Sequence, residues 1–192
     1  MNFTRNLLAI ALTGFVATSG MAMTKAEHSS AKDSISANYK AAKAQCDTLK
    51  ANAKDVCMKE AKGNENIAKA ELEAQYKPSE KADHKVRKER ADAAYEVAKE
   101  KCDDLDGNAK DVCKKDAKAE HVKAIENAKV AQAQAKPAES MSEKRADVAE
   151  AKQDAAHEKR EAEYKAAKER CEPLKGDVQD KCEADAKRKY AQ

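Results

Sequence analysis

Six cysteines stand in three pairs, each with ten residues between its members, and this spacing constrains the fold more than any other feature of the chain. The pairs are Cys46/Cys57, Cys102/Cys113 and Cys171/Cys182. Each pair lies in a copy of one segment, and the copies begin at Tyr39, Tyr95 and Tyr164. Three copies of one segment predict three copies of one local structure joined in a row.

The spacing favours structural disulfides within each pair. Zinc sites usually carry cysteines two to four residues apart within a half-site, and thioredoxin-like redox chemistry uses C-x-x-C, so ten intervening residues fit neither. A bond within a pair closes a loop of about twelve residues and stabilises by about 3 kcal/mol on the chain-entropy model. A redox sensor or a metal site is the alternative for these six cysteines.

The first 22 residues predict a secretory signal peptide. Arg5 precedes an apolar run over 7–17, and the small-residue site at 20–22 predicts cleavage before Met23. The apolar run is too short for a membrane span, and we expect no transmembrane segment in the mature chain. An even number of cysteines in an exported chain predicts disulfides, so we expect a periplasmic or secreted protein.

Composition limits the core that the mature chain can form. Both phenylalanines, Phe3 and Phe15, lie in the predicted signal peptide, and the sequence has no tryptophan. Alanine, lysine and glutamate favour helices, and the 5 glycines and 3 prolines leave few breaks. The net charge of +3 is spread over interleaved acidic and basic residues, which supports exposed helices and argues against nucleic-acid binding.

Apolar residues ahead of each first cysteine recur at steps of three and four, which predicts one face of a helix. The middle of each pair carries turn signals. Gly107 and Gly176 suit a left-handed residue at the end of the first helix, and Asn52, Asn108 and Asp177 suit the N-cap of the second. Each cysteine pair is therefore predicted to bracket a tight turn between antiparallel helices.

The predicted fold class is all-α, an elongated array of three disulfide-stapled antiparallel helical hairpins. Pro78 and Pro137 mark the breaks between hairpins, which gives a signal peptide at 1–22 and hairpin repeats at 23–77, 78–136 and 137–192. The six helices are expected at about 24–50, 53–76, 80–106, 108–135, 141–175 and 178–190. The sequence leaves open whether the hairpins pack side by side or string out.

Two histidines are the candidate metal ligands. His28 and His84 occupy matching repeat positions, each directly after an acidic residue, and copy three has Gln153 there. Aligned hairpins could bring the two imidazoles to one divalent ion, although duplication alone also explains the match. His121 and His157 follow no such pattern and are expected to be solvated. Each repeated tyrosine is expected to cover its disulfide, with docking of a partner as the alternative.

Residues 91–119 resemble the repeated unit of small secreted proteobacterial proteins that are rich in Ala, Lys and Glu and carry cysteine pairs. Proteins of this group are sometimes labelled cell-envelope biogenesis proteins of TolA type, and the resemblance extends through the repeats over nearly all of the mature chain. The similarity to TolA itself lies in composition. The resemblance implies an envelope location and transfers no functional residues.

The residues therefore predict a non-enzymatic structural or interaction protein of the cell envelope that presents charged helical hairpins to envelope proteins or other periplasmic components. No Ser/His/Asp arrangement and no glycine-rich phosphate loop occur in the sequence, and we expect no catalysis and no cofactor. One alternative is a stress-protective or chaperone-like hydrophilic protein, which is usually disordered in water. The other is a periplasmic metal or redox buffer that uses His28, His84 and the cysteines.

Overall fold

The computed structural model describes residues 23–192, and the predicted signal peptide at 1–22 lies outside the described residues. The described chain forms six α-helices and one short 3-10 turn. In chain order these are α1 Lys25–Cys46, α2 Ala51–Tyr76, α3 Glu80–Lys101, the 3-10 turn η1 Cys102–Asp104, α4 Gly107–Ala135, α5 Met141–Glu169 and α6 Asp177–Tyr190.

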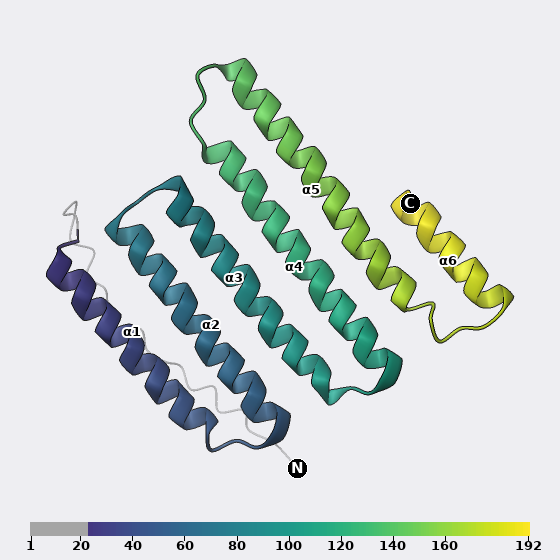
Figure 1. Ribbon diagram of the computed structural model, residues 1–192, viewed down its shortest axis with the longest axis horizontal. Helices are drawn as coiled ribbons and strands as arrows, with labels where there is room; N and C mark the ends of the chain where they lie inside the picture. The colour runs from purple at the N-terminus through teal and green to yellow at the C-terminus, as the bar shows by residue number, and fades with distance from the viewer. Residues whose placement is uncertain (1–22) are drawn as a thin grey trace, which may run out of the picture.

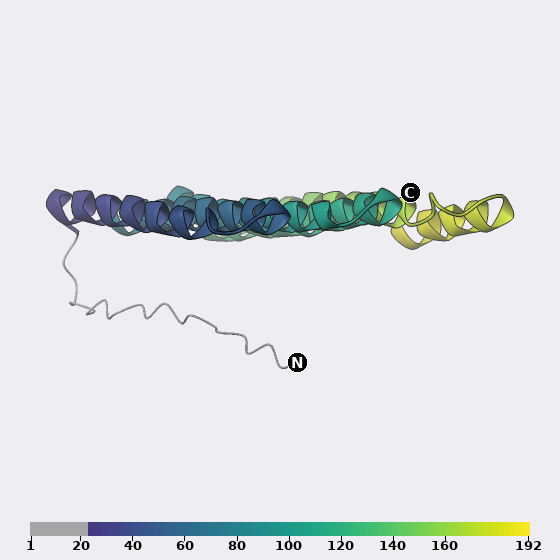
Figure 2. The ribbon, with the colours of Figure 1, turned by 90° about the horizontal axis from the view of Figure 1, so that it is seen from below.

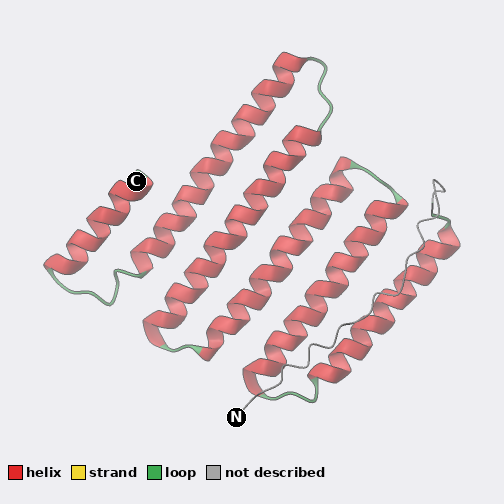
Figure 3. Cartoon of the chain, turned by 180° about the vertical axis from the view of Figure 1, so that it is seen from behind, coloured by secondary structure: helices red, strands yellow, loops and turns green. Residues whose placement is uncertain are grey.

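The six helices lie side by side in chain order, each antiparallel to the one before (Figure 1). Seen edge-on, they form a single layer (Figure 2). The all-α array of three antiparallel hairpins is confirmed, and the hairpins pack against one another, because α2 contacts α3 and α4 contacts α5. Within residues 23–192, helices and connecting loops account for the whole chain (Figure 3).

Short polar caps fix where the first helix of each hairpin begins. The hydroxyl of Thr24 accepts from the backbone N–H of Glu27 at 3.2 Å, and the Glu27 carboxylate accepts from the Thr24 N–H at 2.7 Å. Ser79 and Ser140 cap α3 and α5 in the same position. Each cap satisfies a backbone donor that the first helical turn leaves free.

The first helix of each hairpin is shorter than predicted. α1 ends at Cys46, α3 ends one residue before Cys102, and α5 ends two residues before Cys171. The chain then turns: the backbone N–H of Leu49 donates to the Cys46 carbonyl at 3.0 Å, and the same bond recurs in the other two copies at 3.1 and 3.0 Å. The predicted helix ends near 50, 106 and 175 were wrong because this turn begins at the cysteine.

One repeat position in each turn has a left-handed backbone. Ala51, Gly107 and Gly176 stand at equivalent places and have φ values of 49°, 53° and 57°. The two glycines were predicted to be left-handed residues that end the first helix, whereas the structure places them where the second helix begins. The N-caps of these second helices, Lys50 among them, make no side-chain cap hydrogen bond.

Small side chains fill the contacts between helices. Among the described residues, the buried apolar set consists of nine alanines, three cysteines and one leucine. It comprises Cys46, Ala61, Ala70, Leu72, Ala91, Cys102, Ala117, Ala119, Ala128, Ala155, Ala166, Cys171 and Ala186. Burial of a methyl group contributes little per residue, so the disulfides and helix propensity carry a large share of the stability.

None of the helices within 23–192 combines the length and the apolar character needed to cross a lipid bilayer.

Candidate functional site

The three predicted disulfides form within their own pairs. The Cα atoms of the bonded cysteines lie 5.5, 5.6 and 5.8 Å apart in the first, second and third pair, within the usual range for disulfides. The first cysteine of each pair, Cys46, Cys102 or Cys171, is at most 1% exposed. Three disulfides are consistent with an oxidising extracytoplasmic location.

The disulfide turns lie along one edge of the layer, the lower-right edge in Figure 1, whereas the loops that join the hairpins lie along the opposite edge. A leucine follows each first cysteine by three residues. Leu49 and Leu105 are 42% and 40% exposed, and Leu174 is partly exposed. We call the turns 47–50, 103–106 and 172–176, with these three leucines, the disulfide edge.

Ion pairs flank the leucines of the first two copies. Lys54 Nζ lies 3.0 Å from Asp47 Oδ1, and at the equivalent place Lys110 Nζ lies 2.9 Å from Asp103 Oδ1. Lys114 also reaches Asp103, at 2.8 Å. Hydrogen bonds from Lys114 and then Lys110 lower the pKa of Asp103 from 3.8 to about 2. The edge therefore presents apolar side chains beside fixed charge pairs.

The contact between hairpins is repeated along the array. The Asn52 side chain donates from Nδ2 to the Glu100 carbonyl at 3.1 Å, and Asn108 donates to the Glu169 carbonyl at the same distance. Asn52 and Asn108 were predicted as N-caps, and this prediction was wrong because their amides face the next hairpin. No sequence signal distinguishes these two uses of an asparagine.

Charge pairs across the same two interfaces also match. Lys59 lies 3.8 Å from Glu100 across the α2–α3 contact, and Lys115 lies 3.7 Å from Glu169 across the α4–α5 contact. Two further matched pairs are Lys101 with Glu60 and Arg170 with Asp116. The second hairpin therefore meets the third as the first meets the second.

The structure separates the two histidines that the sequence offered as metal ligands. His28 Nε2 lies 2.9 Å from Glu73 Oε1, and its ring stacks on Tyr76 with centroids 4.2 Å apart. His84 Nδ1 lies 3.3 Å from the Ala128 carbonyl on α4. His28 thus contacts α2 while His84 contacts α4, and the two do not come together in the candidate metal group found among residues 23–192.

His121 was expected to be solvated, and this expectation was wrong. Its side chain is 14% exposed, its Nε2 lies 2.7 Å from Asp92 Oδ1, and its ring stacks on Tyr95 with centroids 4.7 Å apart. The partners are a carboxylate and a tyrosine three residues apart on the facing helix, as at His28. The sequence feature that could have predicted these histidine contacts is an acidic residue three positions before a tyrosine, at Glu73/Tyr76 and Asp92/Tyr95.

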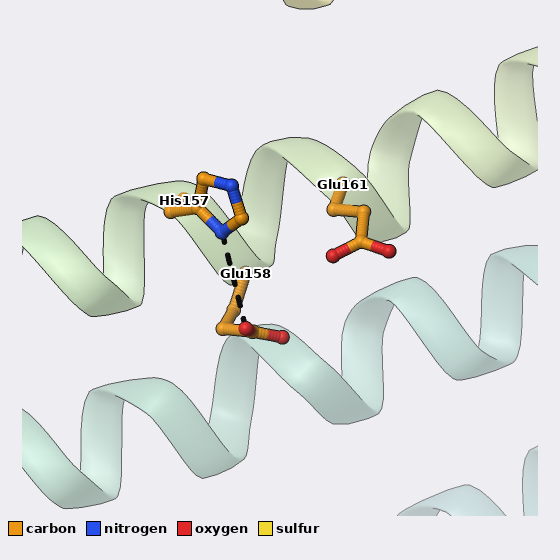
Figure 4. A group of neighbouring side chains, drawn as sticks. All are labelled: His157, Glu158 and Glu161. Carbon is orange, nitrogen blue, oxygen red and sulfur yellow. Dashed lines mark ion pairs between the residues drawn. The ribbon is translucent and has the colours of Figure 1, made fainter. Parts of the chain in front are cut away.

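The remaining histidine is exposed as expected, and it has acidic neighbours. His157, Glu158 and Glu161 of α5 each offer one ligand atom, and these atoms all lie within 4.8 Å of one another. Figure 4 shows the His157 imidazole facing the Glu158 carboxylate, with Nδ1 and Oε1 3.9 Å apart. This group was not predicted; the spacing of four places His157 and Glu161 on one helix face, whereas Glu158 follows His157 directly in the sequence.

Comparison with protein-family models, with curated proteins and with solved structures gives no match.

Proposed function

We propose that the protein is a non-enzymatic structural or interaction protein of the cell envelope, periplasmic or secreted, which binds envelope partners along its disulfide edge. The observation that carries the proposal is the threefold repetition of one disulfide-clamped turn on a single edge, each with a leucine at the surface. Repeated identical features on one edge suit several weak contacts to one extended partner.

The ordered backbone of the disulfide edge supports a binding role for its exposed leucines. Each turn is closed by a disulfide whose first cysteine is buried and by the hydrogen bond from the leucine N–H to the cysteine carbonyl. A surface that is already ordered loses less conformational entropy when a partner binds. Leu49 and Leu105 are exposed on such ordered turns, and the neighbouring charge pairs can select the partner's charge pattern.

An extracytoplasmic compartment fits the chemistry of this edge. Disulfides persist where the environment is oxidising and are rare in reducing compartments, and the turns depend on theirs. The resemblance of residues 91–119 to small secreted envelope proteins supports the same location. The partners we propose are envelope proteins or other periplasmic components with an apolar strip flanked by charges.

The test compares capture of envelope components by three forms of the oxidised protein. The first is the unaltered protein, the second carries Leu49→Ser, Leu105→Ser and Leu174→Ser, and the third carries Met141→Ser. Met141 is a matched control because it is 70% exposed and begins α5 at the opposite edge. We expect cross-linked partners with the unaltered protein and the Met141 variant, and their loss in the triple variant.

Two results would contradict the proposal. One is recovery of no envelope component by the oxidised protein at low or moderate salt. The other is identical capture by the triple leucine variant, which would move any binding surface away from the disulfide edge. Circular dichroism of each variant checks that the fold is retained.

A further inference from the structure

We propose that one face of the helical layer binds the surface of an anionic lipid bilayer through lysines of the first two hairpins. We call it the basic face, and it consists of Lys25 and Lys32 of α1, Lys81, Lys85 and Lys88 of α3, and Lys118 of α4. None of these residues belongs to the disulfide edge. The inference adds a second surface to the proposed envelope function, and its test uses lipid alone, so either can fail without the other.

The helical period gathers lysines that are interleaved with acidic residues along the chain. Lys81, Lys85 and Lys88 follow one another at steps of four and three, which places them on one side of α3. All three are exposed, and they line an open hollow of about 400 Å³ together with Lys77. The charges that balance over the whole sequence are therefore not balanced on this part of α3.

Contacts around Glu73 place lysines of α1 on the same face as those of α3. Glu73 of α2 also lines the hollow, and its carboxylate lies 2.9 Å from Nε2 of His28 on α1. Lys25 and Lys32 stand three residues before and four residues after His28, so they flank it on the surface of α1. Both lysines are exposed, and the basic face therefore begins at the first helix.

A second series of contacts extends the basic face to α4. Lys88 Nζ lies 2.5 Å from one carboxylate oxygen of Asp92, and the other oxygen lies 2.7 Å from Nε2 of His121 on α4. Nδ1 of the same imidazole lies 3.5 Å from Nζ of Lys118. Lys118 therefore lies on the same side of the layer as Lys88.

Most lysines of the basic face have no acidic partner. Within residues 23–192, Lys88 is the one member of the six that forms an ion pair. Like charges three or four residues apart destabilise a helix, and Lys81, Lys85 and Lys88 are such neighbours. An anionic partner relieves this repulsion, which the fold itself leaves uncompensated.

The third hairpin shows that the fold does not require these lysines. The repeat position shared by Lys25 and Lys81 carries Glu150 in the third copy. The position of Lys85 carries Asp154 there. Because α5 still forms a helix and packs against α4, the positive charge at these positions is a property of the first two hairpins and not of the packing.

The shape of the basic face selects a flat partner. The helices form a single layer (Figure 2), and the lysines are distributed over three helices of that layer. α1 and α3 have 22 residues each and are therefore about 33 Å long. A planar anionic surface can meet all six lysines at once, whereas a chain-like polyanion would meet one row. Each lysine that approaches an anionic bilayer strengthens binding, and salt weakens the attraction.

The test is sedimentation of the oxidised protein with lipid vesicles at low salt. One set is phosphatidylcholine alone, and the other is an equal mixture of phosphatidylcholine and phosphatidylglycerol. We expect binding to the mixed vesicles only, and its loss at high salt. The triple variant Lys25→Ala, Lys81→Ala and Lys85→Ala should bind about a hundredfold more weakly, because each lysine at such a surface contributes about fivefold.

The matched control makes the same change of charge on the third hairpin. It carries Lys152→Ala, Lys175→Ala and Lys181→Ala, three exposed lysines outside the basic face, and it should bind the mixed vesicles as the unaltered protein does. Circular dichroism of both variants checks that the helices are retained.

Several results would overturn the proposal. The first is the absence of binding to the mixed vesicles at low salt. Equal binding to the neutral vesicles would show that lysines do not carry the interaction, and equal weakening in the two triple variants would show an effect of net charge alone. Binding of a soluble polyanion, dextran sulfate, without binding to vesicles would assign the basic face to a chain-like partner and exclude the bilayer.

Discussion

Gly63 of α2 lies directly against Ala93 of α3. A Cβ atom built on Gly63 would stand 2.7 Å from the Ala93 Cβ, closer than two such atoms can approach. The residues at the equivalent repeat positions are Ala119 of α4 and Ala162 of α5. The first two hairpins therefore use the missing side chain of a glycine to approach closely, whereas the equivalent position on α4 carries the Cβ of an alanine.

Gly63→Ala should destabilise the protein by about 1 kcal/mol. Overpacking costs about 1 to 3 kcal/mol, and the better helix propensity of alanine returns about 1 kcal/mol. Denaturant unfolding measures the difference. The double variant Gly63→Ala with Ala93→Gly places the glycine on the other helix. Its free energy of unfolding should be close to that of the unaltered protein. A stabilising single substitution would show that the two helices do not meet at these residues.

Ala51→Gly should stabilise the protein by about 0.5 to 1 kcal/mol. Ala51 has φ of 49° at the place where the other two copies have glycine, and a left-handed backbone costs an L-residue about 1 to 2 kcal/mol. The greater freedom of glycine in the unfolded chain cancels part of the gain. Unfolding by denaturant again gives the change, and Ala41→Gly within α1 should instead destabilise by about 1 kcal/mol.

Lys114→Ala should raise the pKa of Asp103 from about 2 towards its ordinary value of 3.8, because the hydrogen bond from Lys114 is the largest cause of the lowering. The pKa of Asp103 is lower in the folded state, so its contribution to stability is present above about pH 4 and is lost as the pH falls through about 2. Carbon-13 chemical shifts of the Asp103 carboxyl follow the titration. Lys115→Ala serves as the control, because Lys115 pairs with Glu169.

Reduction of the three disulfides should remove much of the helical circular-dichroism signal and lower the midpoint of thermal unfolding. Each bond closes a loop of about twelve residues, which is worth about 3 kcal/mol on the chain-entropy model, and mostly alanine is buried between the helices. A disordered stress-protective protein would instead show little helix in either redox state. Retention of the full helical signal after reduction would mean that helix packing, rather than the disulfides, holds the hairpins.

Repetition made the architecture predictable. The cysteine spacing placed each turn, and the breaks at Pro78 and Pro137 separated the hairpins, so the class, the number of helices and the disulfide pairing could all be predicted. The ends of the first helix in each hairpin were predicted four to six residues too late, because lysine, alanine and leucine continue past Cys46 with no change in propensity. The turn begins there because the disulfide and the bond from Leu49 N–H to the cysteine carbonyl close it.

Contacts between hairpins could not be predicted from the sequence, because each contact depends on how two helices are aligned with one another. Asn52 has the residue type and position of an N-cap, yet its amide lies beside the Glu100 carbonyl of another hairpin. His28 and His84 share a repeat position but face different helices, since α1 has only α2 beside it while α3 lies between α2 and α4. Equal positions in a repeat therefore do not ensure equal neighbours.

Disulfide mapping of the oxidised protein by mass spectrometry shows whether each hairpin is closed by its own cysteine pair. Proteolysis without reduction should release peptides that join Cys46 to Cys57, Cys102 to Cys113 and Cys171 to Cys182, since each pair has Cα atoms within 5.8 Å of one another. Peptides that join cysteines of different copies, or unpaired thiols in the folded protein, would contradict an array of hairpins held at their turns.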